Sequence, residues 1–327
     1  MGRDPRIVPP GSLQHVVDVT FQHRCLLRPS PALNRMVAGV LGRAQRLFGM
    51  EIVAVVVLST HVHWLLRPRD AQHLADFMGY VKTNMSKEIG RLHGWKGSLF
   101  NGRYHTSTVA DEEAAQVGVL RYVLSQTVKE GLVARAEEWP GVHCGPLLVR
   151  GESLQGAWHD RTAEHAGAER TMFAEEVVFS PLPCWAEVPE ATWRSWVAGI
   201  LEDVESTAAT ERQGRPVLGA KEICAVDPSS RRSEVPSSPQ RRFHAVGEAS
   251  KKALEDAWHQ LIEAYRRASK ELRHGDAARV VREKWFPEGM FAPSMGFVSF
   301  GDGAVGGAGP VGAEHLLTNW GIRGRPA

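Results

Sequence analysis

Two histidines separated by one residue are the sharpest chemical feature of the sequence. His61-Val62-His63 follows the apolar run Ile52–Leu58 and begins a strand that returns from it. Side chains at i and i+2 of a strand share a face, so both imidazoles project together while Val62 and Trp64 point into the core. Two neutral imidazoles on one face are a start for a divalent metal site. Because the H-x-H pattern also occurs by chance, a metal site needs further support.

That support comes from the helix predicted over 111–127. Its apolar side is formed by Val117, Leu120 and Leu124. Gly118, Tyr122 and Gln126 fall on the opposite side at a spacing of four residues. A tyrosine hydroxyl and an amide oxygen one helical turn apart are placed to reach one metal-bound phosphate. An exposed Tyr–Gln pair of no consequence is the alternative.

The elements around these residues predict an α+β fold. Strands are expected at 15–22, 52–58, 61–66 and 99–109, and helices at 32–48, 71–93 and 111–127. The first strand alternates, with Val17, Val19 and Phe21 on one face and Asp18, Thr20 and Gln22 on the other. Two helices packed on one face of an antiparallel sheet satisfy this order and leave the other face free for a ligand.

This arrangement resembles the single-tyrosine HUH transposases, and among them the REP-associated tyrosine transposases. The resemblance rests on His61-Val62-His63, on Tyr122-Val123-Leu124-Ser125-Gln126 and on Lys129-Glu130-Gly131-Leu132-Val133. The opening strand His15–Phe21 and the segment Phe100–Tyr104 also match the family's layout, so the resemblance covers roughly residues 12–147. Many relatives have Pro-Asn where this chain has Ser59-Thr60, and many have Asn-Pro where it has Gln126-Thr127.

The resemblance implies an RRM-like antiparallel sheet with helices. It implies that His61, His63 and Gln126 hold a divalent cation, Mg²⁺ or Mn²⁺, with a coordination position left open for the scissile phosphate. It also implies that Tyr122 is the nucleophile, which cleaves and rejoins single-stranded or hairpin DNA through a 5′-phosphotyrosine intermediate. The function implied is DNA transposition.

Two surfaces are candidate DNA contacts. Tyr80, Lys87 and Arg91 lie on a polar, basic face of the helix at 71–93, which is otherwise a solvated face. Arg103 and Tyr104 stand together on the strand at 99–109, where packing is the alternative. The remaining histidines of the first half have no comparable spacing and receive no role: His15, His23, His73, His93, His105 and His143.

Charge divides the 327 residues into two parts. Residues 1–147 carry 17 Lys and Arg against 12 Asp and Glu, a net charge of +5, whereas residues 148–327 carry 22 against 25, a net charge of −3. The first part is therefore the expected partner of an acidic ligand. Residues 1–147 form the expected catalytic domain, and a mostly helical C-terminal extension follows. That extension is predicted as a linker at 148–170, a helical accessory region at 171–295 with a Pro/Ser/Arg loop at 227–242, and a Gly-rich flexible tail at 296–327.

Four scattered cysteines without a C-x-x-C pair exclude a zinc ribbon and suggest reduced thiols. The start of the sequence has no apolar signal segment, and no apolar run is long enough to cross a bilayer, so a cytoplasmic protein without membrane contact is expected. The sequence leaves open whether Tyr122 acts in its own site or in that of a partner within a homodimer.

Two other functions compete with the transposase. A non-catalytic nucleic-acid binder on an RRM-like sheet, such as a domesticated repressor, would bind DNA without metal and without cleavage. A two-histidine phosphoesterase would need a second His-x-Thr/Ser motif, and His105-Thr106-Ser107 has that pattern.

Overall fold

The computed structural model describes residues 6–231, 241–274 and Met290. Its strands are β1 (Gln14–Val19), β2 (Glu51–Val57), β3 (His61–Arg67), β4 (His105–Val109), β5 (Leu154–His159), β6 (Met172–Val177) and β7 (Phe243–His244). Its α-helices are α1 (Pro31–Phe48), α2 (Ala71–His93), α3 (Glu113–Lys129), α4 (Cys144–Arg150), α5 (Arg161–His165), α6 (Glu190–Arg212), α7 (Ala220–Ala225) and α8 (Glu248–His274).

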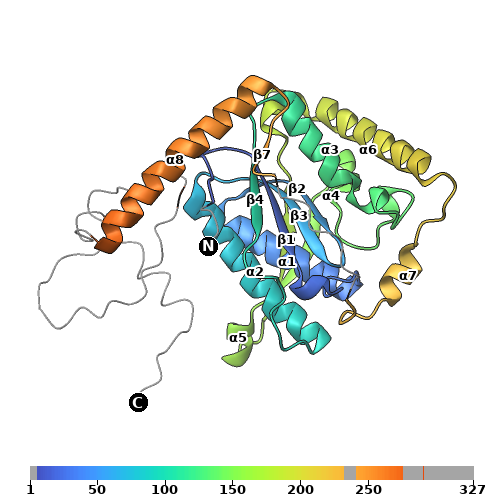
Figure 1. The fold of residues 1–327 in the computed structure, drawn as a ribbon. Helices are drawn as coiled ribbons and strands as arrows, with labels where there is room; N and C mark the ends of the chain where they lie inside the picture. Colours follow the sequence, from blue (N-terminus) through green and yellow to red (C-terminus); the bar gives the residue numbers. More distant parts are fainter. Residues whose placement is uncertain (1–5, 232–240, 275–289, 291–327) are drawn as a thin grey trace, which may run out of the picture. The chain divides into compact units, whose positions relative to one another are not determined.

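The central sheet has the strand order β2-β3-β1-β4-β7 (Figure 1). Its first four strands pair antiparallel, and only β7 runs parallel to its neighbour β4. The chain order β1-α1-β2-β3-α2-β4 is the βαββαβ pattern of an RRM-like fold. The predicted α+β class with an antiparallel sheet is therefore confirmed.

Local capping explains where the first two helices begin and end. The hydroxyl of Ser30 accepts a hydrogen bond from the Leu33 N–H at 3.2 Å, and α1 ends at Gly49 with a φ of 67°. The carboxylate of Asp70 accepts from the His73 N–H at 2.8 Å, and α2 ends at Gly94 with a φ of 62°. Both boundaries match the sequence prediction, because their signals lie within one helical turn.

The burial of β1 is the reverse of a simple alternating strand. The polar side, which includes Asp18 and Thr20, faces α2 and is 2% or less exposed, whereas Val17 and Val19 are half-buried on the other face. Asp18 is accommodated by Lys82 of α2, whose Nζ lies 2.7 Å from the carboxylate. Burial nevertheless raises the pKa of Asp18 to about 6.

The second face of the sheet is not left open. α3 contacts β2, β3 and β4 there, and it packs with its other side on α6 (Figure 1). The expectation of helices on one face alone therefore covers α1 and α2 but not α3. The consequence is that Tyr122 of α3 lies over the same face as the histidines of β3.

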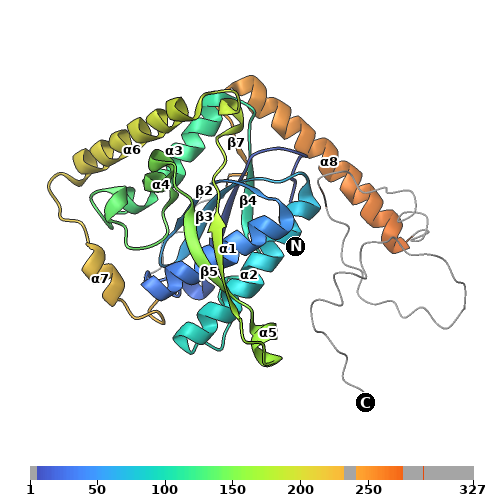
Figure 2. The ribbon, with the colours of Figure 1, turned by 180° about the vertical axis from the view of Figure 1, so that it is seen from behind.

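Residues 148–170, predicted as a linker, instead contain the end of α4, the strand β5 and the short helix α5. β5 pairs antiparallel with β6, and this hairpin lies over α1, as Figure 2 shows from behind. Glycines make the close approach possible. A Cβ on Gly39 of α1 would lie 2.0 Å from the Ala157 carbonyl oxygen, and a Cβ on Gly156 would lie 2.2 Å from the Gly39 nitrogen.

Gly39→Ala should therefore destabilise the protein by about 1–3 kcal/mol, the usual cost of overpacking. Gly79 of α2 is the matched control, because a Cβ there meets nothing within 4 Å. Gly79→Ala should stabilise by roughly 0.5–1 kcal/mol through helix propensity alone. Urea unfolding of the two variants measures both effects, and equal shifts would contradict the close packing of β5 on α1.

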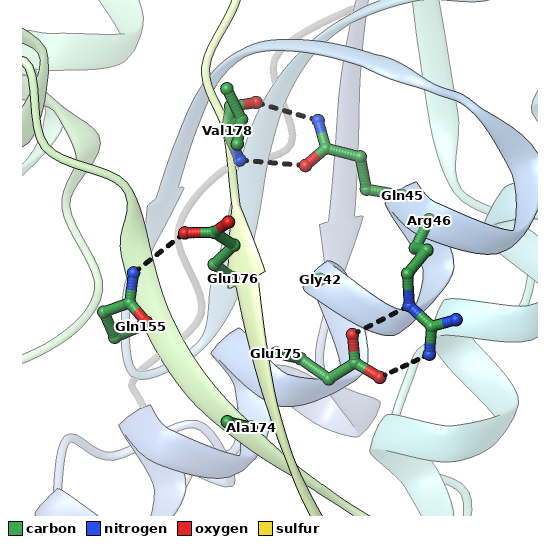
Figure 3. Close-up of a pocket in the computed structure, with 8 residues that line it drawn as sticks. All are labelled: Gly42, Gln45, Arg46, Gln155, Ala174, Glu175, Glu176 and Val178. Carbon is green, nitrogen blue, oxygen red and sulfur yellow. Dashed lines mark hydrogen bonds and ion pairs between the residues drawn. The ribbon is translucent and has the colours of Figure 1, made fainter.

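A groove of about 570 Å³ lies between α1 and the β5–β6 hairpin (Figure 3). Its polar groups pair with one another. Arg46 forms an ion pair with Glu175 at 2.8 Å, and the Gln45 amide bonds both the N–H and the carbonyl of Val178. These contacts fasten the hairpin to α1, so the groove is part of the packing and lies apart from the histidines.

The region predicted as helical, 171–295, contains α6, α7 and α8, but it also contains the strands β6 and β7. The predicted loop 227–242 ends directly before β7; its residues 232–240 lie outside the described residues, as does the Gly-rich segment 296–327. None of the described helices is long and apolar enough to span a membrane.

Candidate active site

Strand β3 places His61 and His63 on the face of the sheet that α3 covers. Their ring centroids are 5.0 Å apart, and in the register His63 lies opposite Val17 of β1. Val62 and Trp64 point to the other face and are 0% and 1% exposed. Val62 and Trp64, which alternate with the histidines, therefore anchor the strand, as predicted, and leave the two imidazoles on one face.

Helix α3 brings Tyr122 to this pair. The Tyr122 ring stands edge-on to His63 with 5.7 Å between the centroids, and the side chain keeps 40% of its surface exposed. The ammonium of Lys129, two helical turns further on, lies 5.3 Å from the centre of the Tyr122 ring. The candidate nucleophile Tyr122, the Lys129 ammonium and the imidazoles of β3 therefore lie close together.

Gln126 lies one helical turn from Tyr122, as the spacing requires, but unlike Tyr122 it is buried. Only 3% of its surface is exposed, and its Nε2 donates to the Tyr122 carbonyl at 2.7 Å. The strip of α3 that was expected to face away from the core is open at Gly118 and Tyr122 and closes at Gln126. The physical reason is that this strip faces the sheet, where Tyr122 contacts His15 and His63.

Two further histidines on this face had no signal in the sequence. His15 of β1 stacks on His63 with an interplanar angle of 9°, and its Nε2 lies 3.0 Å from the His63 Nδ1. The other ring nitrogen of His15, Nδ1, lies 3.2 Å from Nε2 of His244 on β7. The pairing of β1 with β3, once recognised, is the only signal that would have pointed to His15.

Burial keeps these imidazoles neutral. It is the main reason why the pKa of His15 falls to about 3 and why the pKa of His63 lies well below its usual range. His63 Nε2 is buried and has no hydrogen-bond partner among the described residues. A buried lone pair without a donor is what a bound cation would satisfy, so the residues present fit a metal ion.

The third ligand must be of another kind. Within the described part of the chain, no three His, Cys, Asp or Glu side chains are grouped so as to hold a metal ion. An amide oxygen, such as Oε1 of Gln126, is therefore the type of group that would complete a set with His61 and His63.

The first predicted DNA surface, on α2, lies across the sheet from the histidines, because Lys82 of the same helix pairs with Asp18 on the opposite face. Tyr80 packs between Phe48 and Trp158, with ring distances of 5.7 and 6.0 Å. Lys87 is exposed, and Arg91 is exposed but bonds Glu88, which Arg161 also holds. The β5–β6 hairpin, not foreseen in the sequence, is the reason why Tyr80 is a packing residue.

The two residues of the second predicted DNA surface, Arg103 and Tyr104, differ in their exposure. Tyr104 is only 8% exposed, and the guanidinium of Arg6 stacks 3.5 Å from its ring centre. Tyr104 is therefore a packing residue, against the expectation of a DNA contact, while its neighbour Arg103 is exposed.

His143 is a buried histidine away from the metal-ligand candidates, and it predicts a pH dependence of stability. Burial lowers its pKa to about 4, against the opposing effect of the hydrogen bond that Nε2 donates to the Leu124 carbonyl; Nδ1 accepts from the Gly145 N–H. Below pH 6.5 this histidine therefore binds a proton in the unfolded chain but stays neutral in the folded protein. Its contribution to the free energy of unfolding is fully present above pH 6.5 and is lost as the pH falls toward 4. The loss of unfolding free energy between pH 7 and pH 5 should be about 2 kcal/mol smaller in His143→Asn than in the wild type. Urea titrations at both pH values measure this difference, and an equal loss of unfolding free energy in the two proteins would contradict it.

Comparison with known proteins finds similarity to transposases in the first half of the chain. The model of a family described as "Transposase IS200 like" matches residues 13–126, which include His15, His61, His63, Tyr122 and Gln126. Residues 13–126 are therefore similar to the IS200-like transposases. The ISDra2 transposase TnpA of Deinococcus radiodurans is 30% identical over 88 residues, which are 25% of this chain and 61% of that protein. The chain thus spans less than two thirds of the length of this relative.

Two solved structures are also similar. The structure of a REP-associated tyrosine transposase bound to a REP hairpin has 20% identity and a TM-score of 0.36, covering 43% of this chain and 81% of its own. A putative transposase from Deinococcus radiodurans has 21% identity and a TM-score of 0.27, covering 38% and 98%. β7 and His244 lie beyond the segment that matches the IS200-like family.

Proposed function

We propose that this protein is a transposase that cuts and rejoins single-stranded or hairpin DNA through a covalent tyrosine intermediate. The observation that carries the proposal is that Tyr122 of α3 lies beside His63 of β3, whose buried Nε2 has no hydrogen-bond partner among the described residues. The similarity of residues 13–126 to the IS200-like transposases supports the same reaction class.

In the proposed reaction, Tyr122 Oη attacks the phosphorus of a DNA phosphodiester. The bond from phosphorus to the 3′-oxygen breaks, the phenolic proton goes to solvent, and the leaving 3′-oxygen takes up a proton. The DNA then remains linked to Tyr122 by its 5′-phosphate. Attack by a 3′-hydroxyl on this linkage reverses the step and rejoins a strand without ATP, since the phosphodiester bond energy is conserved.

His61 Nε2 or Nδ1, His63 Nε2 and Gln126 Oε1 would hold the cation, Mg²⁺ or Mn²⁺. When bound, it supplies charge stabilisation to the phosphate oxygens. Lys129 adds a positive charge on the nucleophile's side, where it contacts the phosphate as a point charge. Partial exposure of Tyr122 lets a flexible single strand enter, which a stiff duplex would do less easily.

The Tyr122 ring lies beside the rings of His15 and His63 of the same chain, so one chain can supply both the nucleophile and a metal ligand of the proposed site. The two-histidine phosphoesterase has less support, because His105 Nε2 is engaged by the Ser107 hydroxyl and the Arg241 carbonyl, both at 3.0 Å.

The test is a denaturing gel of the full chain incubated with end-labelled hairpin DNA and Mn²⁺. We expect a protein–DNA adduct that survives SDS and heat and that disappears when EDTA is present. DNA binding in a native gel without any adduct at any Mn²⁺ concentration would favour the non-catalytic binder.

A further inference from the structure

Three imidazoles form a hydrogen-bonded chain that leads away from the proposed metal ligands. His63 Nδ1 lies 3.0 Å from His15 Nε2, and His15 Nδ1 lies 3.2 Å from His244 Nε2. His15 stacks on His63 with a centroid distance of 5.3 Å, and His244 is tilted against His15 at 5.2 Å. Both ring nitrogens of His15 are thus engaged by its two imidazole neighbours, His63 and His244.

The chemistry of neutral imidazole sets the direction of these bonds, since each ring has one N–H donor and one lone pair. If His63 Nε2 binds a cation, its proton must be on Nδ1 and donate to His15 Nε2. His15 then carries its proton on Nδ1 and donates to His244 Nε2. The opposite direction would leave an N–H at His63 Nε2, buried and without an acceptor among the described residues, which costs about 1–3 kcal/mol.

We propose that His15 and His244 are positioning residues, which hold His63 in the tautomer and orientation that present Nε2 to the metal. The inference rests on the proposed function, because it concerns the same site. Partners behind a ligating histidine are a general means of fixing its ring, and removing one usually weakens metal binding by about 10–100-fold. His244, the last residue of this hydrogen-bonded series, belongs to the C-terminal extension and lies outside residues 13–126.

The backbone holds β7 in place independently of the His244 side chain. The Thr108 N–H donates to the Arg242 carbonyl at 3.2 Å, and the Ala110 N–H donates to the His244 carbonyl at 2.8 Å. The Ser107 hydroxyl bonds the Arg241 carbonyl at 2.5 Å. A change of the His244 side chain is therefore expected to leave the strand attached, so His244 variants report on the imidazole itself.

The experiment measures Mn²⁺ binding to the metal-free full chain by EPR, without DNA. His15→Leu should bind Mn²⁺ about 10–100-fold more weakly, and His244→Leu should show a smaller loss of up to about 10-fold. His15→Gln should recover most of the affinity, because its amide oxygen can accept from His63 Nδ1. The control is His73→Gln, a buried histidine on α2 that bonds only the Arg69 N–H and the Phe48 carbonyl among the described groups, and it should bind as the wild type does.

A second measurement needs no metal. Nitrogen-15 NMR of the histidine rings should find His63 protonated at Nδ1 in the wild type, and this preference should be lost in His15→Leu. A wild-type His63 protonated at Nε2, or unchanged Mn²⁺ affinity in both leucine variants, would overturn the inference. If the wild type forms the DNA adduct and the leucine variants bind Mn²⁺ normally, only this inference fails. If no adduct forms but the variants lose Mn²⁺ affinity as expected, only the proposed function fails.

Discussion

Tyr122→Phe should abolish the covalent protein–DNA adduct. The substitution removes one oxygen atom and keeps the ring that stands edge-on to His15 and His63 at 5.7 Å, so the surrounding packing is preserved. Without the hydroxyl no bond to phosphorus can form. The cleavage rate should fall by at least about 10⁴-fold, because removing a protein nucleophile costs up to roughly 10⁶-fold in a serine protease.

The matched control is Tyr80→Phe, which removes a tyrosine hydroxyl on α2, across the sheet from the site. We expect its adduct yield to stay within twofold of the wild type. Binding of the hairpin to Tyr122→Phe in a native gel should also be retained, since the hydroxyl acts in bond formation. Adduct formation by Tyr122→Phe at the wild-type rate would rule out Tyr122 as the nucleophile.

Loss of the metal site should have the second largest effect. His63→Ala removes the buried Nε2 that has no partner among the described residues, and EDTA removes the cation itself. Each should reduce cleavage by about 10³-fold or more, since a metal contributes several kcal/mol and each 1.36 kcal/mol is worth a factor of ten. Added Mn²⁺ should restore the chelated wild type but not His63→Ala.

His73→Gln serves as the control here too, because it alters a histidine that is 5% exposed and lies on α2. Circular dichroism must show that His63→Ala is folded before its activity is interpreted. Full cleavage in EDTA, or rescue of His63→Ala at low Mn²⁺ concentration, would contradict a metal held by the two histidines.

Local signals explain why much of the fold was predictable. The continuous apolar run from Ile52 predicted β2, and the short turn and apolar residues after it predicted the returning strand β3. The caps at Ser30, Gly49 and Gly94 lie within one turn of the helix ends that they set. The pair His61 and His63 was predictable for the same reason, because alternation along one strand decides which side chains share a face.

The features that were missed depend on contacts between distant residues. His15 is 48 residues from His63, and His244 is 229 residues from His15, so neither pair has a spacing that the sequence could display. The sequence of β5 is polar, contains a glycine and lacks a strand pattern, so it predicts a linker; Gly156 lets the strand approach α1 closely. The packing of Tyr104 could not be predicted either, because the residue that covers its ring, Arg6, lies almost a hundred positions away in the sequence.

Burial was the least predictable property of the site. Periodicity placed Tyr122 and Gln126 on one strip of α3, but it could not foresee that α6 packs against this helix and that Gln126 is enclosed. Periodicity therefore indicated which of these side chains share a face, whereas the exposure of each one follows from tertiary packing.

The most direct measurement is peptide mapping of the covalent adduct by mass spectrometry. The wild-type chain is incubated with hairpin DNA and Mn²⁺, digested with nuclease and trypsin, and searched for a residual 5′-nucleotide. We expect the added mass on the peptide that contains Tyr122, linked through phosphate to its phenolic oxygen. A nucleotide attached to another residue, or no covalent product under conditions in which the DNA is cut, would contradict cleavage by Tyr122.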